Sequence, residues 1–322
     1  MRRRELMLLL GGATFLGAPI GRAQEPGRVY RLGIMFGQPR EEAGNVALFD
    51  ELRRAGFIEG ENLQVDGRFS MREEEAPEVA AMLVAAGVDA IVTGGYPRAR
   101  VVQQATRTIP ILIVADDLVL SGLVPSLAHP GGNTTGISIL ATELDGKRQE
   151  LLTELVPAAR HIAALSDPRI TAPDQLRALE DAARARGIAF SICLAAKSED
   201  IVPAIDAAQA SGAQALNVLA TPLFDTNRRL IIERTATLKL PTIYQWPEIA
   251  EAGGLAAYGP RRTEVSRQEA RQLVKIFRGA KPADIPVEQP TTFDLVINLN
   301  TAKAFGLTIP SSILSRAGEV IE

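Results

Sequence analysis

Cysteine, histidine and aromatic residues are scarce in this sequence. Among 322 residues there are one cysteine and two histidines, and 5% of the residues are aromatic. A single cysteine cannot form an internal disulfide, so a hydrophobic core has to stabilise the fold. His129 and His161 stand alone, without the paired spacing to other ligands that is typical of zinc sites. We therefore expect neither a disulfide framework nor a metal site.

Motifs that bind nucleotides or build a hydrolase triad are also missing. No G-x-G-x-x-G follows the first expected strand, and no Walker-type G-K-[ST] sequence is present. The run from Gly136 to Ile139 lacks the second glycine of a nucleophile elbow. These absences predict no cofactor and no recognisable catalytic residue, although an unfamiliar enzyme stays open as an alternative.

The chain carries no excess of positive charge. Its 35 basic and 38 acidic residues give a net charge of −3. Removal of residues 1–23, which contain four Arg and one Glu, changes the net charge to −6. Nucleic-acid-binding proteins carry basic patches that contact phosphates. The composition therefore predicts no nucleic-acid partner.

Residues 1–23 have the order of a signal peptide. Arginines at 2–4 precede an uncharged apolar run at 6–20, and small residues flank Arg22 at a cleavage site. The run is shorter than the roughly 20 apolar residues of a membrane-spanning helix. No cysteine follows the site, so a lipid anchor is not expected. We expect a periplasmic protein exported by the Sec or the twin-arginine route.

Beyond the leader, short apolar runs alternate with segments of helical periodicity. Continuous Ile, Val and Leu runs between helices indicate parallel sheets that are buried on both faces. The expected strands are 29–36, 63–69, 90–93, 111–115, 162–165, 190–194, 215–219 and 242–244. The expected helices follow Val46 and span 73–86, 97–106, 173–186, 201–210 and 227–238. We predict an α/β fold of two doubly wound, Rossmann-like lobes joined by a multi-crossing hinge.

The last part of the chain departs from this alternation. A helix around 270–277 is followed by a Pro-rich segment and a strand at 295–299. A tail placed after two complete lobes is expected to cross back between them. We expect lobe I to contain 28–138 with about 259–282, and lobe II about 139–258 with 283–322. The Gly-rich stretch at 126–138 is interpreted as a turn that leads into the first crossing.

Candidate ligand contacts follow from strand positions, because open α/β sheets bind ligands beyond the carboxyl ends of their strands. The first lobe supplies Gly37, Gln38, Thr93, Gly94, Gly95, Tyr96 and Asp117. The second supplies Ser166, Thr221, Gln245 and Trp246. The two glycines let the backbone approach a ligand, and a helix N-terminus after them favours an anionic group. Asp117 is expected to pair with a cation, and the only tryptophan to stack on an apolar body.

Asp116 and Asp117 raise the possibility of a periplasmic enzyme that uses one as acid and the other as base. Adjacent residues of a strand point to opposite faces, so the pair is poorly placed to act on one atom. A ligand-sensing protein without a transport role is a third reading.

Several longer segments are shared with a known family. They are GLVPSLAHPGGNTTG at 122–136, GKRQELL at 146–152, AGGLAAYG at 252–259, GAKPADIPVEQP at 279–290 and EVIE at 319–322. With them, nearly the whole chain resembles the periplasmic substrate-binding proteins of ABC transporters, a family that includes tryptophan-binding-like members. Where that family usually has an Asp-Pro pair, this chain has Asp117-Leu118.

The resemblance implies a type I periplasmic-binding-protein fold whose hinged cleft closes on a small ligand. It implies an inner-membrane ABC permease, with its cytoplasmic ATPase, as the partner. We expect a monomer that captures a small molecule, either an amino acid or an aromatic acid, and catalyses no reaction.

Overall fold

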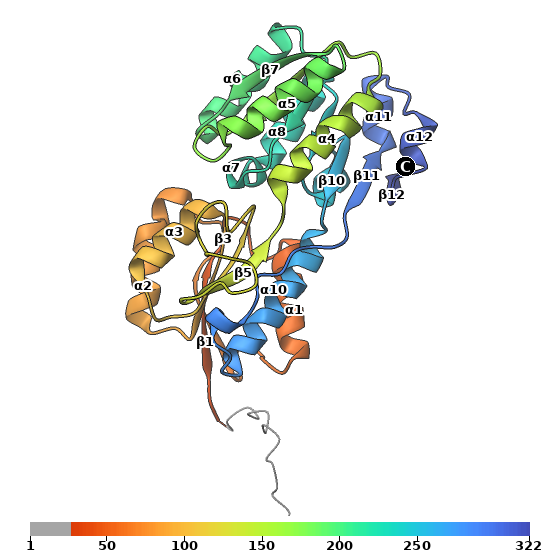
Figure 1. The fold of residues 1–322 in the computed structure, drawn as a ribbon. Coiled ribbons are helices and arrows are strands. Elements are labelled where there is room, and N and C mark those ends of the chain that lie inside the picture. Colours follow the sequence, from red (N-terminus) through yellow and green to blue (C-terminus); the bar gives the residue numbers. More distant parts are fainter. Residues whose placement is uncertain (1–26) are drawn as a thin grey trace, which may run out of the picture.

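The computed structural model describes residues 27–322, except for the side chains of residues 141 and 142. The expected signal peptide lies outside these residues. Two α/β lobes are joined by several chain segments (Figure 1). Within the described residues, every helix is too short or too polar to cross a membrane.

Lobe I is built on a parallel sheet in the order β2-β1-β3-β4-β5. Its strands are β1 (Tyr30–Met35), β2 (Leu63–Arg68), β3 (Ala90–Gly94), β4 (Ile111–Ala115) and β5 (Thr134–Ser138). Its helices are α1 (Ala43–Arg54), η1 (Glu73–Glu75), α2 (Ala76–Ala86), α3 (Tyr96–Ala105), α10 (Arg262–Phe277) and η2 (Pro282–Asp284). Helices α2 and α3 cover one face of the sheet, and α1 and α10 cover the other (Figure 1). Their apolar side chains form a separate core on each face. This double cover explains the continuous apolar runs of the strands.

Lobe II has a larger sheet in the order β12-β11-β10-β9-β8-β6-β7. Its strands are β6 (His161–Ser166), β7 (Ala189–Leu194), β8 (Ala215–Val218), β9 (Thr242–Tyr244), β10 (Ala256–Gly259), β11 (Asp294–Asn298) and β12 (Glu319–Ile321). Its helices are α4 (Ala141–Leu155), α5 (Pro173–Ala185), α6 (Ser198–Ala210), α7 (Pro222–Thr226), α8 (Arg228–Leu238), α9 (Pro247–Glu251), α11 (Leu299–Phe305) and α12 (Ser311–Leu314). The sheet is parallel from β7 to β10, and β11 pairs antiparallel with β10.

The two sheets repeat one strand order. The order β7-β6-β8-β9-β10 in lobe II matches β2-β1-β3-β4-β5 in lobe I, and both are doubly wound. The prediction of two doubly wound lobes is therefore confirmed, and the tail strands β11 and β12 extend the second sheet.

Three segments connect the lobes. They lie between β5 and α4, between β10 and α10, and between η2 and β11 (Figure 1). The second and third bracket α10, whose apolar side chains belong to the core of lobe I. The third runs beside β5, where the Glu288 amide donates to the carbonyl of Gly136 at 3.0 Å. A multi-crossing hinge results.

The interpretation of 126–138 as a turn is wrong for its second half. Thr134–Ser138 is strand β5, fully buried and paired with β4. Gly136 is required there because a Cβ would lie 1.9 Å from the carbonyl oxygen of Ile113, and its φ is +152°. The glycine interrupts the apolar pattern that marks the other strands, so the strand escaped detection. The first crossing starts after Ser138.

Candidate ligand-binding cleft

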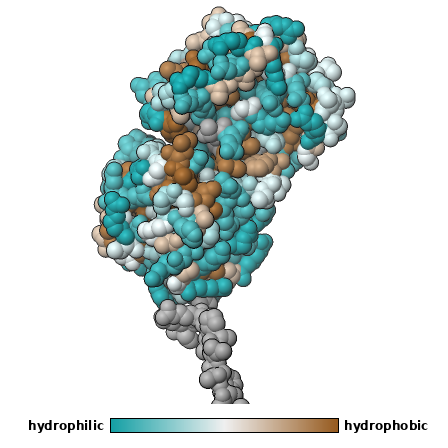
Figure 2. Space-filling view, in the orientation of Figure 1, coloured by the Kyte–Doolittle hydropathy of each residue, from teal (hydrophilic) through white to brown (hydrophobic). Residues whose placement is uncertain are grey.

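A cleft of about 450 Å³ lies between the lobes and is lined by the segments that follow the strands of both sheets. Clefts of this size hold small organic ligands. Hydrophobic residues gather around the junction of the lobes on the face shown in Figure 2. The position agrees with the strand-end rule from which the candidate contacts were predicted.

Ten of the eleven predicted contact residues line this cleft. They are Gly37, Gln38, Thr93, Gly94, Gly95, Tyr96, Asp117, Thr221, Gln245 and Trp246. Ser166 does not: it is fully buried at the end of β6, and its hydroxyl has no hydrogen-bond partner among the described residues. Residues 169–172, in the turn after it, line the cleft instead.

The start of α3 forms one wall in lobe I. Gly95 has φ +81°, and a Cβ at this position would lie 2.6 Å from Pro222 of lobe II. Glycine therefore permits both the turn and the approach of the lobes. No side chain caps the helix, and Pro97 occupies its first turn. The first-turn amides and the helix dipole favour a negatively charged group at this end.

The two carboxyl groups after β4 differ in their surroundings. Asp117 Oδ1 accepts hydrogen bonds from the amides of Val119 at 2.9 Å and Leu120 at 2.8 Å, so this carboxylate holds the following turn. The Asp116 carboxyl takes part in no hydrogen bond among the described residues and also lines the cleft. Burial raises the pKa of Asp116 to about 7, and the negative charge of Asp145 adds to the shift.

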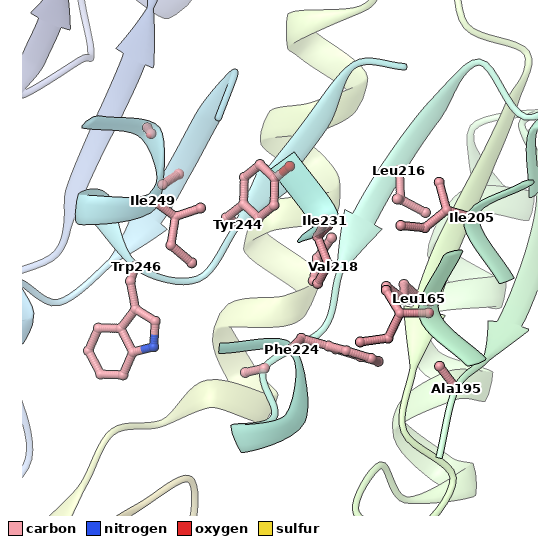
Figure 3. Close-up of a cluster of buried hydrophobic side chains, with 14 of the residues drawn as sticks. Leu165, Ala195, Ile205, Leu216, Val218, Phe224, Ile231, Tyr244, Trp246 and Ile249 are labelled. Atoms are coloured by element: carbon pink, nitrogen blue, oxygen red, sulfur yellow. The ribbon is translucent and has the colours of Figure 1, made fainter. Parts of the chain in front are cut away.

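Lobe II contributes an amide donor and an aromatic ring. The Nε2 atom of Gln245 is buried and has no hydrogen-bond partner among the described residues. Trp246 is 7% exposed and lies at the edge of the core cluster drawn in Figure 3. The Arg262 guanidinium covers the ring at 4.4 Å from its centroid. Thr221 accepts a hydrogen bond from Phe224 N at 3.3 Å and so caps α7.

Polar contacts across the cleft join the lobes. Arg262, at the start of α10, donates to Asp225 of lobe II at 2.9 Å and lies 3.4 Å from Glu42 of lobe I. Gln38 Nε2 also donates to Asp225, at 3.0 Å. Burial alone would raise the pKa of Asp225, but the Arg262 guanidinium holds it below its usual value. We call Gln38, Asp225 and Arg262 the interlobe latch.

A buried network supports the back of the cleft. Asp145 and Arg148 of α4 form a fully buried ion pair, and Gln175 of α5 donates to the same carboxylate. Arg148 also donates to the carbonyl of Tyr258 at 3.1 Å. Buried charges require such partners, since unpaired ones are costly.

Sequence reasoning missed Asp145, Asp225, Arg262 and Glu269, all of which line the cleft. They lie on helices at positions that carry no local motif. On α10, however, Arg262, Val265, Ser266 and Glu269 have helical spacing and form one face. Helix packing alone decides that this face meets the cleft.

Comparison with known proteins identifies the family. The profile of the family described as ABC transporter substrate binding protein matches residues 41–321. The chain is 26% identical over 264 residues to a tyrosine-binding protein of Clostridioides difficile strain R20291. The matched region covers 80% of this chain and 74% of the relative.

Solved structures show the same fold. A Streptococcus pneumonia ABC domain in complex with L-Trp has a TM-score of 0.81 and 25% identity, over 91% of this chain and 100% of that one. A conserved domain protein from Vibrio cholerae has a TM-score of 0.82 and 27% identity, over 91% and 99%. The ligand-free, open structure of CD0873 from Clostridium difficile has a TM-score of 0.64 and 25% identity, over 91% and 99%. With its family profile, fold and interlobe cleft, this chain belongs to the ABC transporter substrate-binding proteins.

Proposed function

We propose that this protein is an extracytoplasmic solute-binding protein that captures an amino acid between its lobes and delivers it to an ABC importer. One observation carries the proposal: the cleft sets an unpaired carboxyl, that of Asp116, near an uncapped helix N-terminus and a buried tryptophan. A zwitterion with an apolar body has the complementary groups. Closure around such a ligand would shift the population toward the form that a permease recognises.

Each polar group of the ligand has a proposed partner. The α-ammonium pairs with Asp116, because Asp117 is already engaged in its turn. The carboxylate meets the first-turn amides of α3 and the free Nε2 donor of Gln245. Trp246 and Tyr96 pack against the rest of the molecule.

The relatives support an amino-acid ligand. One is named for tyrosine, and another was crystallised with L-Trp. The higher TM-score with the L-Trp complex than with the open, ligand-free structure agrees with a closed arrangement of the lobes. The contact of Gly95 with Pro222 and the interlobe latch point the same way.

The importer would be an inner-membrane permease with its cytoplasmic ATPase, and the protein would act as a periplasmic monomer exported by its leader. A sensing protein would use the same cleft without a permease. Catalysis by Asp116 and Asp117 is disfavoured because two backbone amides already bind Asp117 Oδ1.

A thermal-shift screen of residues 24–322 against the twenty amino acids tests the proposal. Ligand at 100 times its Kd should stabilise the fold by about 2.7 kcal/mol. L-tryptophan should be compared with two analogues: tryptamine, which lacks the carboxylate, and indole-3-propionate, which lacks the ammonium group. Each analogue should bind more weakly than L-tryptophan. The absence of any amino-acid hit would contradict the proposed ligand class. Conversion of a hit into product would establish an enzyme, and loss of uptake on deletion of the gene would distinguish transport from sensing.

A further inference from the structure

The acidic side chains that line the cleft fall into two groups. Asp117, Asp145, Asp225 and Glu42 each accept a hydrogen bond or form an ion pair. Asp116 and Glu269 do neither among the described residues, although both line the cleft. Among the described cleft-lining residues, the ionisable groups without a partner are therefore carboxyls.

Every arginine that lines the cleft already has a carboxylate. Arg98 lies 3.3 Å from Glu73, and Arg169 lies 2.7 Å from Asp167. Arg262 is held by the interlobe latch. No guanidinium of the described cleft lining is left over to neutralise Asp116 or Glu269.

Glu269 is buried deep on the cleft-lining face of α10. It is 4% exposed, and its Oε1 atom has no hydrogen-bond partner among the described residues. A buried carboxyl without a partner costs free energy whether it is ionised or protonated. A side chain of this kind in a ligand cleft indicates that a group of the bound ligand supplies the missing hydrogen-bond or ion-pair partner.

Asp116 and Glu269 come from different elements, the segment after β4 and helix α10. The charges that act on Asp116 come from Asp145, Arg148 and Asp117, whereas burial alone acts on Glu269. Neither carboxyl contributes to the pKa shift of the other, so we treat them as two sites for two groups of the ligand.

We propose that the ligand carries a second positively charged group, in addition to its α-ammonium, and that this group binds Glu269. The ligand class is then the basic amino acids and closely related cations. This inference rests on the proposed function and adds the charge of the ligand's side chain.

The protonation of Glu269 supports this assignment. Burial raises its pKa to about 8, so the free protein holds the carboxyl mainly protonated at neutral pH. Of the elements packed on α10, strands β3, β4 and β5 carry no titratable side chain. Helix α1 carries Asp50, Glu51, Arg53 and Arg54, which pair among themselves, while Glu51 also meets Arg271 of α10. A bound cation would ionise Glu269 and release its proton.

Two matched ligand pairs test the proposal by isothermal calorimetry at pH 7.5. L-arginine is compared with L-citrulline, and L-lysine with L-norleucine, because each pair differs mainly in one positive charge. The cationic member of at least one pair should bind about tenfold more tightly, as expected for one charge-assisted hydrogen bond. Equal or tighter binding of the neutral member in both pairs, or no binding by any of the four, overturns the inference.

Variants then assign the preference to Glu269. Glu269→Gln should abolish the preference for the cationic member of the pair. Glu264→Gln is the matched control, since Glu264 lies exposed on the same helix and pairs with Arg267. A preference that survives in Glu269→Gln contradicts the assignment.

Wild-type calorimetry in two buffers of different ionisation enthalpy gives a readout that needs no variant. L-arginine should release more protons on binding than L-citrulline, and equal release counts against the role of Glu269.

If L-tryptophan or L-tyrosine binds and the basic amino acids do not, the proposed function stands and this inference fails. If no amino acid binds, the proposed function fails with it.

Discussion

The two lobes share one strand order but face the cleft with different chemistry. In lobe I, Asp116 after β4 and Glu269 on the packed helix α10 lack partners among the described residues. In lobe II, Asp145 is bonded to Arg148 and Gln175, and Asp167 to Arg169. The repeated architecture therefore sets where the cleft forms, while individual residues beyond the strands and on helix α10 set what each wall can bind. We infer that lobe I recognises charge and that lobe II closes over the ligand.

Removal of the aromatic wall of lobe II should have the largest effect. Trp246→Ala should weaken binding of any hit about 100-fold and lower the free energy of unfolding by about 3 kcal/mol, because the ring is also part of a buried core cluster. Trp246→Phe should retain most of the stability and part of the affinity. Calorimetry and thermal melting measure the two effects. An unchanged Kd in Trp246→Ala would remove this residue from the site.

A steric block between the lobes should have the next largest effect. In Gly95→Ala the Cβ would lie 2.6 Å from Pro222, so the closed form should be disfavoured and binding weakened about tenfold or more. Gly87→Ala is a matched control, since Gly87 also has a positive φ, +62°, but nothing within 4 Å of an added Cβ. Gly87 is in the left-handed region, where alanine costs about 1 kcal/mol, whereas Gly95 has ψ 148° and its alanine variant should bear more strain. Only Gly95→Ala should bind weakly, and thermal melting of both variants measures the difference in strain. Equal affinities would show that Gly95 does not limit closure.

Loss of the interlobe latch should have a smaller effect. Asp225→Asn leaves Arg262 without its ion pair to lobe II, and we expect a larger radius of gyration and about fivefold weaker binding. Asp181→Asn removes an exposed carboxylate that pairs with Arg184 and serves as control. Small-angle scattering of the free proteins measures the opening. If Asp225→Asn scatters like the wild type, the latch does not hold the lobes.

The remaining prediction is on stability as a function of pH, and it concerns the unpaired wall of lobe I. The folded-state pKa of Glu269, about 8, lies above its ordinary value of 4.5, so the native state binds more protons than the unfolded state. The free protein should therefore lose stability as pH rises between these values, by up to about 1.4 kcal/mol per pH unit from this group. Glu269→Gln should reduce the slope of Tm against pH between 5 and 8 and leave a smaller slope from Asp116, whose pKa is also raised by burial. A wild-type slope in Glu269→Gln would show that other groups cause it.

Much of the fold could be predicted from the sequence, because buried parallel strands are continuous apolar runs. The strands 111–115 and 242–244 have the predicted bounds. The prediction failed where glycine interrupts a pattern. Gly136 hid strand β5, and Gly146, within a helix, hid α4.

The site was predicted only as far as strand ends define it. Asp117 and Trp246 lie two residues beyond the ends of β4 and β9, so the strand-end rule found them. Glu269 and Arg262 reach the cleft because α10 packs on lobe I after the chain has passed through lobe II. The helical periodicity of the sequence predicts the helix but not the lobe on which it packs. The partners that occupy Asp117 and leave Asp116 free are likewise set by backbone geometry after β4.

The stack of Arg262 on Trp246 has a practical consequence. Trp246 is the only tryptophan of the chain, and Arg262 belongs to the helix that packs on the opposite lobe. Separation of the lobes removes the guanidinium from the ring and exposes the indole to water. Its fluorescence therefore comes from one defined position, and its wavelength and intensity should follow opening and closure without a label. Trp246 is therefore an intrinsic fluorescence probe of ligand binding.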